Sequence, residues 1–430
     1  MAGPLDRPRV LFSGARRGLT ITTFPMHDAH TETPLALPAH SSSWALFCIF
    51  LSLGLTSFGG PAAHLGYFRD EFVRRRRWLD EHTFSDVVAL CQFLPGPGSS
   101  QVGIAIGRLR GGVAGAIAAW LGFTLPSVLL LVAFAYGFTL LSDANSLHLL
   151  RGLKIAAVAV VVQAVWSMGR MLCPDRTRAT IAAASAIAVI VFGAAFGQIA
   201  SIVAAGLAGA ALLNSSTEVP GAPPGMPGSR AGALACLAVF VLLLFGLPAA
   251  AASLHSYPLE LFASFYRVGS LVFGGGHVVL PLLEAVVVPH GWVPANTFMA
   301  GYGAAQAVPG PLFSFAAFLG AASSGHPAGI AGALLATVAI FLPSFLLVGA
   351  ALPLWGKLRA FASMRRAMAG INAAVVGILL AALYDPVWTS AVHTARDFAL
   401  VVAAQVLLGW WRVPAWAVVL ITVALAWSVV

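Results

Sequence analysis

Charged side chains are scarce in this sequence. Of its 430 residues only 9% are Asp, Glu, Lys or Arg, whereas 59% are hydrophobic. A soluble domain of this length needs a more polar surface, while a bilayer-spanning helix needs about 20 consecutive apolar residues. Several apolar runs reach that length, so the sequence predicts an all-α polytopic membrane protein surrounded by the lipid bilayer.

Motifs of several enzyme classes are also missing. The sequence contains no Walker A, GxGxxG, GxSxG or HExxH pattern, and therefore indicates neither an ATP-driven engine nor a hydrolase. The four cysteines lie far apart and form no CxxC pair, which argues against a disulfide framework or a zinc site. We expect no cofactor, no metal and no enzymatic activity.

The net charge of +9 needs an explanation in so apolar a chain. In a membrane protein, basic residues hold loops on the cytoplasmic side, and this explanation is preferred to nucleic-acid binding. Residues 1–43 form a polar tail that we expect to be disordered and cytoplasmic, with either Met1 or Met26 as the start. Residues 44–213 and 231–430 form two transporter halves, joined by a Pro/Gly-rich linker at 214–230.

The two halves carry the same motifs in the same order. The first copy has FGGP at Phe58–Pro61, Trp78, QFLPGPGSS at Gln92–Ser100 and FTLPS at Phe123–Ser127. The second copy has FGGG at Phe273–Gly276, Trp292, QAVPGPLFS at Gln306–Ser314 and IFLPS at Ile340–Ser344. A duplicated membrane segment with Gly/Pro breaks at matching places is typical of a secondary transporter.

Basic residues change sides between the copies. The loop before Trp78 contains four arginines, whereas the loop before Trp292 contains none. The loop at 142–148 has no Lys or Arg, but its counterpart holds Lys357, Arg359, Arg365 and Arg366. By the positive-inside rule, this pattern predicts an inverted-topology repeat in a bacterial-type inner membrane, with the N-terminus in the cytoplasm.

Each copy is expected to contain a hairpin that turns within the membrane. In the first copy, residues 83–110 enter and leave on the cytoplasmic side, because Arg108 and Arg110 stand at the end of the segment. The hairpin must then turn at the Pro-Gly-Pro sequence that begins at Pro95, and the second copy must turn at Pro309 from the opposite side. The two re-entrant turns are predicted to face each other near the bilayer midplane.

These turns are the predicted anion site. A helix that begins just after a turn offers unpaired N–H groups and a partial positive charge, and serine and glutamine side chains add further donors. For one copy alone, a turn that only ends a helix would explain the pattern, but two opposed copies favour a ligand site. The predicted substrate-binding residues are Gln92, Pro95, Gly96, Pro97, Gly98, Ser99, Ser100, Gln101, Gln306, Pro309, Gly310, Pro311 and Ser314.

A second group contains candidates for gating or coupling. The glycine breaks could equally be packing kinks, Arg69 fits an interfacial position, and Glu284 lies among apolar residues, where a charge is costly. A lone membrane histidine is more often packed than a proton relay, and Lys154 can snorkel. The group comprises Gly59, Gly60, His64, Arg69, Lys154, Gly274, Gly275, His277 and Glu284.

Taken together, these motifs resemble the chromate transporter family in its long, two-domain form. The resemblance rests on FGGP with His64, on Arg77-Trp78-Leu79, and on the PGPGSSQ and RLRGG stretches; in the second half it rests on FGGGHVVLPLLE, Gly291-Trp292 and QAVPGPLFSFAAFLG. It covers about residues 44–430. The second turn departs from the family pattern, because Leu312 and Phe313 follow it in place of a polar residue, so its donors are expected to be fewer.

The resemblance implies export of chromate, a tetrahedral dianion, from the cytoplasm, with chromate resistance as the consequence. Sulfate has the same shape and charge, so sulfate or another oxyanion is an alternative substrate, and a sulfate importer an alternative function. An anion channel of the same architecture is not distinguished by sequence, and an intramembrane chromate reductase lacks any cofactor motif. No nucleic-acid partner is expected, and a homodimer is compatible with the sequence.

Overall fold

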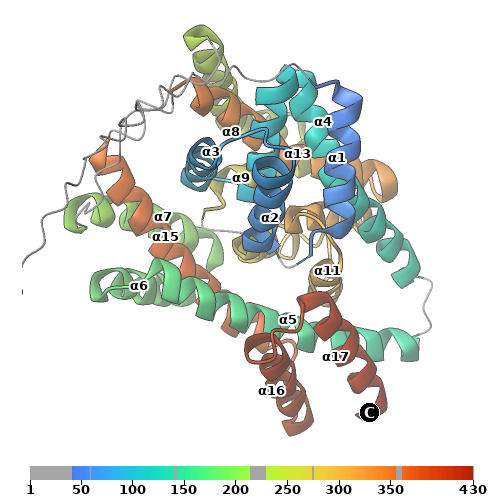
Figure 1. Ribbon diagram of the computed structural model, residues 1–430. Helices are drawn as coiled ribbons and strands as arrows, with labels where there is room; N and C mark the ends of the chain where they lie inside the picture. Colours follow the sequence, from blue (N-terminus) through green and yellow to red (C-terminus); the bar gives the residue numbers. More distant parts are fainter. Residues whose placement is uncertain are drawn as a thin grey trace, which may run out of the picture. The chain divides into compact units, whose positions relative to one another are not determined.

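Every regular element among the described residues is a helix. The computed structural model describes residues 41–58, 60–139, 143–213, 229–273, 276–354 and 361–429. Gly59, Gly274 and Gly275, three of the predicted gating residues, lie outside these ranges. So do residues 1–40 of the predicted tail and residues 214–228 of the predicted linker. Within them the chain is all-α, as the sequence predicts (Figure 1).

The described residues of the first half form seven α-helices: α1 (Ser43–Thr56), α2 (Gly60–Arg69), α3 (Glu81–Phe93), α4 (Gly98–Thr139), α5 (Asp143–Leu172), α6 (Arg176–Phe192) and α7 (Ala194–Leu212). A π-helical turn at Asp70–Arg75 follows α2. The second half contains α8 (Arg230–Leu254), α9 (Tyr257–Leu271), α10 (Val279–Val287), α11 (Ala295–Ala307), α12 (Phe315–Ala321), α13 (Gly329–Ala351), α15 (Ala362–Ala382), α16 (Ala395–Gly409) and α17 (Ala415–Val429). Short 3₁₀ or π-helical turns lie at Gly276–Val278, Leu312–Ser314, Leu352–Leu354 and Leu383–Trp388.

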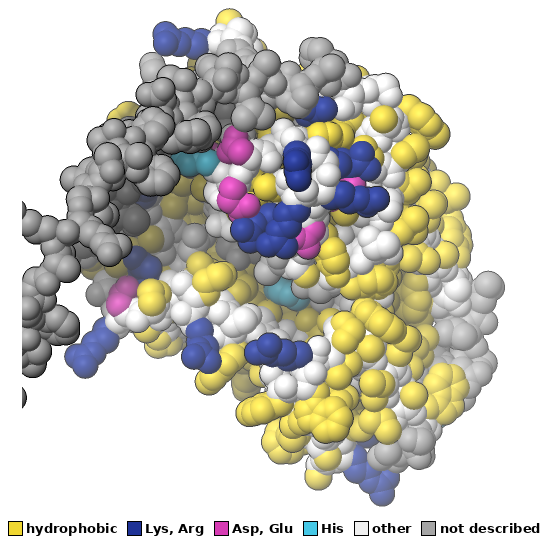
Figure 2. All heavy atoms as spheres, viewed as in Figure 1, with side chains coloured by type: hydrophobic (Ala, Val, Ile, Leu, Met, Phe, Trp, Pro, Cys, Tyr) yellow, Lys and Arg dark blue, Asp and Glu magenta, His cyan; other side chains and the backbone are white. Residues whose placement is uncertain are grey.

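Within the described parts of the chain, five helical stretches are long and apolar enough to cross a membrane: Gly98–Phe138, His148–Leu172, Arg230–Leu254, Gly329–Leu354 and Ala362–Trp388. Large apolar side chains such as Leu129, Phe245 and Trp410 lie on the outside. Exposed apolar surface on this scale is stable in lipid and not in water. Figure 2 shows charged side chains gathered mainly where Figure 1 draws α2 and α3, with apolar side chains over much of the rest of that face. The chain is an integral membrane protein.

The predicted hairpin of the first copy is formed by α3 and the first part of α4. A sharp break interrupts α4 at Gly111 and Gly112, whose backbone angles are not helical. Beyond the break α4 folds back on itself: a Cβ on Gly107 would lie 2.5 Å from the carbonyl oxygen of Gly115. Only glycine allows the two segments to approach so closely. The break directly follows Arg110, the residue at which the sequence predicts the hairpin to end.

The second copy repeats this arrangement with α11, α12 and α13. After its Pro-Gly-Pro turn the chain forms one 3₁₀ turn, Leu312–Ser314, and then α12. Helix α12 packs against the start of α13 through two glycines, since a Cβ on Gly320 would lie 2.2 Å from the carbonyl oxygen of Gly332. Glycine contacts therefore close the helical hairpin in both halves.

The two halves are intertwined. The long helix α5 of the first half packs against α16 and α17 of the second, and α15 of the second half packs against α6 and α7 of the first (Figure 1). The contacts are reciprocal in detail. Gly152 of α5 lies against Val423 of α17, and Gly370 of α15 lies against Gly209 of α7. Each half therefore completes its packing only with helices of the other.

Helix α8 has no counterpart among the described residues of the first half. It packs mainly on α9 and α13, and only 6% of its most apolar window is buried. It precedes α9, which corresponds to α1.

Aromatic side chains join the cores of the two halves. Trp120 of α4 lies 5.6 Å from the ring of Phe341 and 5.5 Å from that of Phe345, both on α13. The core around α1 to α4 includes Phe50, Phe68 and Phe123, and the larger core of the second half extends onto α5. The re-entrant turns lie between these two cores.

Candidate functional site

The two Pro-Gly-Pro turns are held by exchanged backbone hydrogen bonds. The N–H of Gly96 in the first turn donates to the carbonyl oxygen of Val272 at 2.7 Å, and the N–H of Gly310 in the second turn donates to that of Ser57 at 2.9 Å. Ser57 and Val272 are equivalent residues, each directly before an FGG break. Each turn is therefore fixed to the broken helix of the opposite half.

A second exchanged contact involves the serines of the FTLPS and IFLPS motifs. A Cβ on Gly96 would lie 2.9 Å from Ser344 Oγ, and a Cβ on Gly310 would lie 3.0 Å from Ser127 Oγ. Both glycines have a positive φ, +121° at Gly96 and +100° at Gly310, which other residues rarely adopt. The Pro-Gly-Pro sequence thus allows the backbone of each turn to approach the opposite half closely.

The first turn uses Gln101 for its own support. The Nε2 atom of Gln101 donates to the carbonyl oxygen of Pro95 at 2.6 Å, and its backbone N–H donates to that of Pro97 at 2.9 Å. Gln101 is among the predicted substrate-binding residues, but its backbone N–H is not free for a ligand. Helix α4 begins at Gly98, and Gln101 is the first residue whose N–H has an intrahelical acceptor. The N–H groups of Gly98, Ser99 and Ser100 belong to the first helical turn.

Around the first turn lies a buried polar cluster. His64 Nδ1 is 3.2 Å from Ser99 Oγ, and the His64 ring contacts Phe123 edge-on. His64, Ser99 and Ser100 are all at least 96% buried. Three side-chain atoms here, His64 Nε2, Ser100 Oγ and Gln101 Oε1, have no hydrogen-bond partner among the described residues. Buried polar atoms without partners are costly, so the cluster is suited to bind water or a polar ligand.

The second turn is arranged differently. Ser314 Oγ donates to the carbonyl oxygen of Pro311 at 2.6 Å, so the predicted donor is engaged within the turn. The residues after the turn form a single 3₁₀ turn and a seven-residue helix, and Phe313 is buried in the core. In contrast to the first turn, the polar groups here come from side chains of neighbouring elements.

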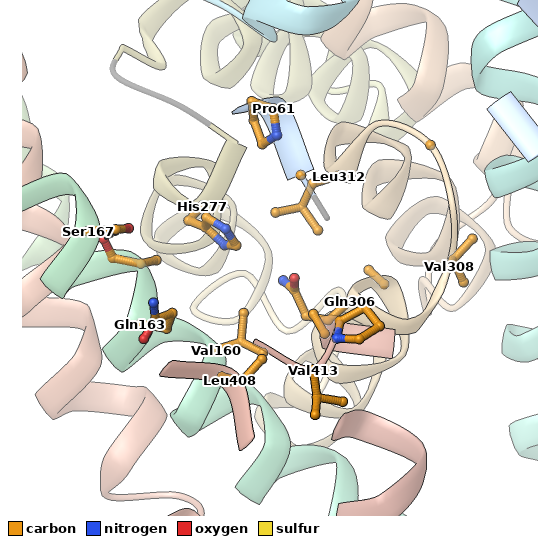
Figure 3. A pocket seen from close by; sticks show the side chains of 16 residues that line it. Pro61, Val160, Gln163, Ser167, His277, Gln306, Val308, Leu312, Leu408 and Val413 are labelled. Carbon is orange, nitrogen blue, oxygen red and sulfur yellow. Dashed lines mark hydrogen bonds between the residues drawn. The ribbon is translucent and has the colours of Figure 1, made fainter. Parts of the chain in front are cut away.

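Those side chains line a cavity of about 310 Å³. Its polar residues are Gln163 and Ser167 of α5, His277 and Gln306, and Gly60, Pro61, Gly310 and Leu312 lie in its wall. In Figure 3 the side chain of Gln306 points into the space between His277, Leu312 and Val413. No Asp, Glu, Lys or Arg is among the described residues that line it. The cavity wall that they form is therefore uncharged, with a few hydrogen-bonding groups on a mainly apolar surface.

Gln92, which corresponds to Gln306 in the first copy, does not line this cavity. Gln92 is exposed and lines a different cavity, of about 450 Å³, together with Arg69 and Glu81. Arg69 forms a salt bridge of 2.6 Å with Glu81, and both side chains are about half exposed. The structure thus brings Gln92 and Arg69 to one surface and does not place the two glutamines in one cavity.

The remaining gating candidates do not form a single site. Lys154 Nζ donates to Asn296 Oδ1 at 2.6 Å and to the carbonyl oxygen of Ser390 at 3.1 Å, which connects α5 to α11. Glu284 is partly exposed on α10. His277 Nδ1 lies 3.1 Å from the hydroxyl oxygen of Tyr302. Gly60 and His277 line the uncharged cavity, whereas Lys154 and Glu284 do not.

Sequence reasoning missed the contribution of α5 to this cavity. Gln163 and Ser167 lie four residues apart in an otherwise apolar helix, so they share one helical face. That spacing was a usable signal. It was overlooked because neither residue belongs to a duplicated motif. Among the described residues, no group of three or more His, Cys, Asp or Glu side chains could hold a metal ion.

Comparison with known proteins identifies relatives over most of the chain. The family model described as Chromate transporter matches residues 44–210 and 259–427, once for each copy and over more than half of the chain. "Chromate transport protein" of Pseudomonas aeruginosa is 30% identical over 381 residues, which cover 83% of each protein. "Chromate transport protein" of Cupriavidus metallidurans is 25% identical over 344 residues, which cover 79% of this chain and 81% of the relative.

A third relative, "Probable chromate transport protein" of Synechococcus elongatus, is 27% identical over 347 residues, 78% of this chain and 82% of its own. No solved structure matches the chain. The duplicated family match, the long apolar helices and the paired turns agree with one another. The chain belongs to the chromate transporter family.

Proposed function

We propose that this protein exports chromate from the cytoplasm and thereby confers chromate resistance. Three related proteins are named for chromate transport, and the family is one of transporters rather than enzymes. The observation that carries the proposal is the pair of exchanged turns, in which a backbone N–H of each turn donates to a carbonyl oxygen of the opposite half. Such breaks at a repeat interface are where secondary transporters bind their substrates.

The driving force requires no ATP. Moving a dianion out of a negative cytoplasm is favoured by about 4–5 kcal/mol per 100 mV, at about 2.3 kcal/mol for each charge. An exporter of this kind needs a site that holds the anion only moderately, since tight binding would slow release. Backbone N–H groups and uncharged side chains meet that need better than arginine or lysine.

We propose alternating access as the mechanism. Cytosolic anion reaches the first turn at Pro97–Gln101, one half then rocks against the other, and the anion leaves past the second turn at Pro311–Ser314. The different states of the two turns support this order: the polar cluster at the first turn is buried, while the second turn opens into a cavity. A carrier exposes one side at a time, whereas an open channel would expose both.

The orientation belongs to the same proposal. We place the N-terminus and the loop with Arg74–Arg77 in the cytoplasm of a cell with a bacterial-type inner membrane, because these arginines are largely exposed next to α2. Single cysteines introduced at Arg75 and at Pro289 should react with a membrane-impermeant thiol reagent from opposite sides. Labelling of both from one side would contradict the inverted arrangement.

The decisive experiment is uptake of labelled chromate and labelled sulfate into inverted membrane vesicles, with and without a membrane potential. Export predicts saturable chromate uptake that rises when the vesicle interior is positive. Ser100→Leu should abolish uptake at unchanged protein level, and Gln92→Leu should reduce it. Transport of sulfate alone would redirect the proposal to a sulfate permease, and full activity of both variants would exclude the first turn from the pathway.

A further inference from the structure

The uncharged cavity at the second turn is built from both halves. Gln163 comes from α5 of the first half, while His277 and Gln306 come from the second, and the chain between α16 and α17 closes one side at Val413 (Figure 3). The volume of about 310 Å³ corresponds to on the order of ten water molecules at about 30 Å³ each. It is large enough for a four-oxygen ion with part of its hydration.

Gln163 is oriented by a second glutamine. Gln405 Nε2 donates to Gln163 Oε1 at 2.8 Å. Because this bond occupies the amide oxygen of Gln163, the NH₂ group of the same side chain remains as its donor at the cavity. A fixed amide offers its donors at less entropic cost than a free one.

His277 is oriented by a tyrosine. The buried hydroxyl of Tyr302 lies 3.1 Å from His277 Nδ1, and among the described residues it has no other hydrogen-bond partner. When Tyr302 donates to Nδ1, a neutral imidazole must hold its proton on Nε2. His277 then offers an N–H donor without carrying a positive charge.

Gln306 supplies the third donor. Its Nε2 atom is buried and has no hydrogen-bond partner among the described residues, although the side chain points into the cavity (Figure 3). A buried amide NH₂ without a partner is costly, and an acceptor in the cavity would remove that cost. Three side chains that carry donors thus line one space, and the described residues that line it include no carboxylate to repel an anion.

We propose that this cavity is a binding chamber for a tetrahedral oxyanion, in which Gln163, His277 and Gln306 donate hydrogen bonds to its oxygens. The inference rests on the proposed function, which it deepens by adding α5 to the site. Gln405 and Tyr302 act as positioning residues. Because the described wall contains no basic residue, each donor contributes a moderate amount, and the ion can leave again.

The first turn has no equivalent of this chamber. The residue equivalent to Tyr302 in the first copy is Val88, which cannot orient a histidine. If Gly152 is matched with Gly370, which make exchanged contacts, the residue equivalent to Gln163 is Ala381. The pseudo-symmetry that relates the turns therefore does not generate a second chamber of this composition.

The test measures equilibrium binding of radiolabelled sulfate and chromate to the purified full-length protein, together with transport in proteoliposomes. Gln163→Leu removes the donor with little change in volume. It should raise Kd about 10- to 100-fold, the range expected for one hydrogen bond to a charged group. Gln163→Glu keeps the shape but adds a negative charge, and it should bind more weakly still.

Gln198→Leu is the matched control. Gln198 is a buried glutamine of α7 whose Nε2 donates to the carbonyl oxygen of Pro281, outside the chamber. It should leave Kd within about twofold of the unchanged protein, since its amide donates to no residue of the chamber wall. Should Gln163→Leu fail to fold, Gln306→Leu provides the same measurement from the second half.

A double-mutant cycle tests the positioning role of Gln405. Gln405→Leu should weaken binding less than Gln163→Leu, and the double variant should bind no more weakly than Gln163→Leu alone. Additive losses would show that Gln405 does not act through Gln163 and would overturn that assignment.

Failure of the chamber and failure of the proposed function give different results. If the unchanged protein transports chromate or sulfate but Gln163→Leu and Gln306→Leu bind and transport normally, the chamber is refuted and the transport function stands. If the unchanged protein neither binds nor transports either ion, the proposed function itself fails.

Discussion

The two re-entrant turns have the same sequence pattern and exchanged backbone bonds, yet their surroundings differ. At the first turn His64, Ser99 and Ser100 are buried together. At the second turn, the half-buried His277 and Gln306 line a cavity. The difference comes from side chains that the duplication did not preserve: Ser99 corresponds to Phe313, and Gln101 to Phe315. A symmetric backbone thus supports one closed polar cluster and one open cavity.

Although their surroundings differ, the two turns are linked through the same pair of exchanged backbone bonds. Gly96 and Gly310 each hold the opposite half at the residue before its FGG break, so a shift of one half moves both turns. The exchanged bonds therefore couple the positions of the two turns. Four changes test the comparison of the turns, from the largest expected effect to the smallest.

The largest effect is expected from Gly96→Ala. A Cβ there would lie 2.6 Å from Gln101 Nε2 and 2.9 Å from Ser344 Oγ, at a φ that costs roughly 1–3 kcal/mol. Membrane yield and transport should fall by more than tenfold. Gly310→Ala should be milder, because its nearest neighbour is at 3.0 Å. Gly112→Ala is the control for backbone strain alone, because Gly112 also has a positive φ but a Cβ there would have no neighbour within 4 Å. Equal losses of yield and transport in all three variants would contradict the role of close approach.

Gln101→Leu should cost about 1–3 kcal/mol of stability. It leaves the partly buried carbonyl oxygen of Pro95 without its side-chain donor, and such an acceptor without a partner is expensive. Thermal unfolding of the purified protein measures the loss. Gln92→Leu serves as the control, since Gln92 is exposed and should change stability by less than about 0.5 kcal/mol. An unchanged unfolding temperature for Gln101→Leu would mean that the first turn does not depend on this brace.

The two equivalent serines should respond in opposite ways. Ser314→Ala removes a donor to Pro311 and should cost about 0.5–1.5 kcal/mol of stability. Ser100→Ala removes a hydroxyl without a partner among the described residues, so it should leave stability unchanged or slightly higher while lowering the rate of chromate transport. Measurement of unfolding temperature and vesicle uptake on the same preparations separates the two. The reverse pattern would contradict the assignment of the turns.

The smallest effect is expected at the N-terminal ends of α3 and α11, where the two hairpins begin. Asp80 caps α3 by accepting from the backbone N–H of Thr83 at 2.7 Å, whereas the equivalent Pro294 gives α11 no side-chain cap. Asp80→Ala should cost about 1 kcal/mol of stability, and Asp80→Asn should restore most of it. Equal stability of all three proteins would show that the cap contributes nothing.

The same cap predicts a pH dependence. Burial tends to raise the pKa of Asp80, but hydrogen bonds from Thr83 outweigh it and hold the pKa below its usual value. The folded protein therefore prefers the ionised carboxylate, and the stabilisation is present at neutral pH and lost as the pH falls through the folded-state pKa. The stability difference between the unchanged protein and Asp80→Ala should accordingly shrink in acid.

Much of the architecture could be predicted from the sequence. Hydropathy and helix breakers are local signals, and they located the helical hairpins, including the break near Gly111 and the turn at Gly310. The orientation of Gln101 could not be predicted in this way. Its side chain could have faced a ligand or its own turn, and only the position of the Pro95 carbonyl oxygen, fixed by the opposite half, decides between them.

The cavity was harder still to foresee. Gln163 is 143 residues from Gln306 along the chain, and the two meet only because α5 crosses to the second half. The separation of Gln92 from Gln306 has the same origin, since equal positions in a repeat need not have equal neighbours. Exposure and hydrogen bonding at such positions depend on packing between the halves.

The order of helices, their breaks and the duplicated turns are set by the sequence, because apolar length, proline and glycine act on the chain within a few residues. The tertiary structure decided which turn is enclosed and which opens onto a cavity. That choice depends on contacts between residues more than a hundred positions apart, which form only when each half packs against the other.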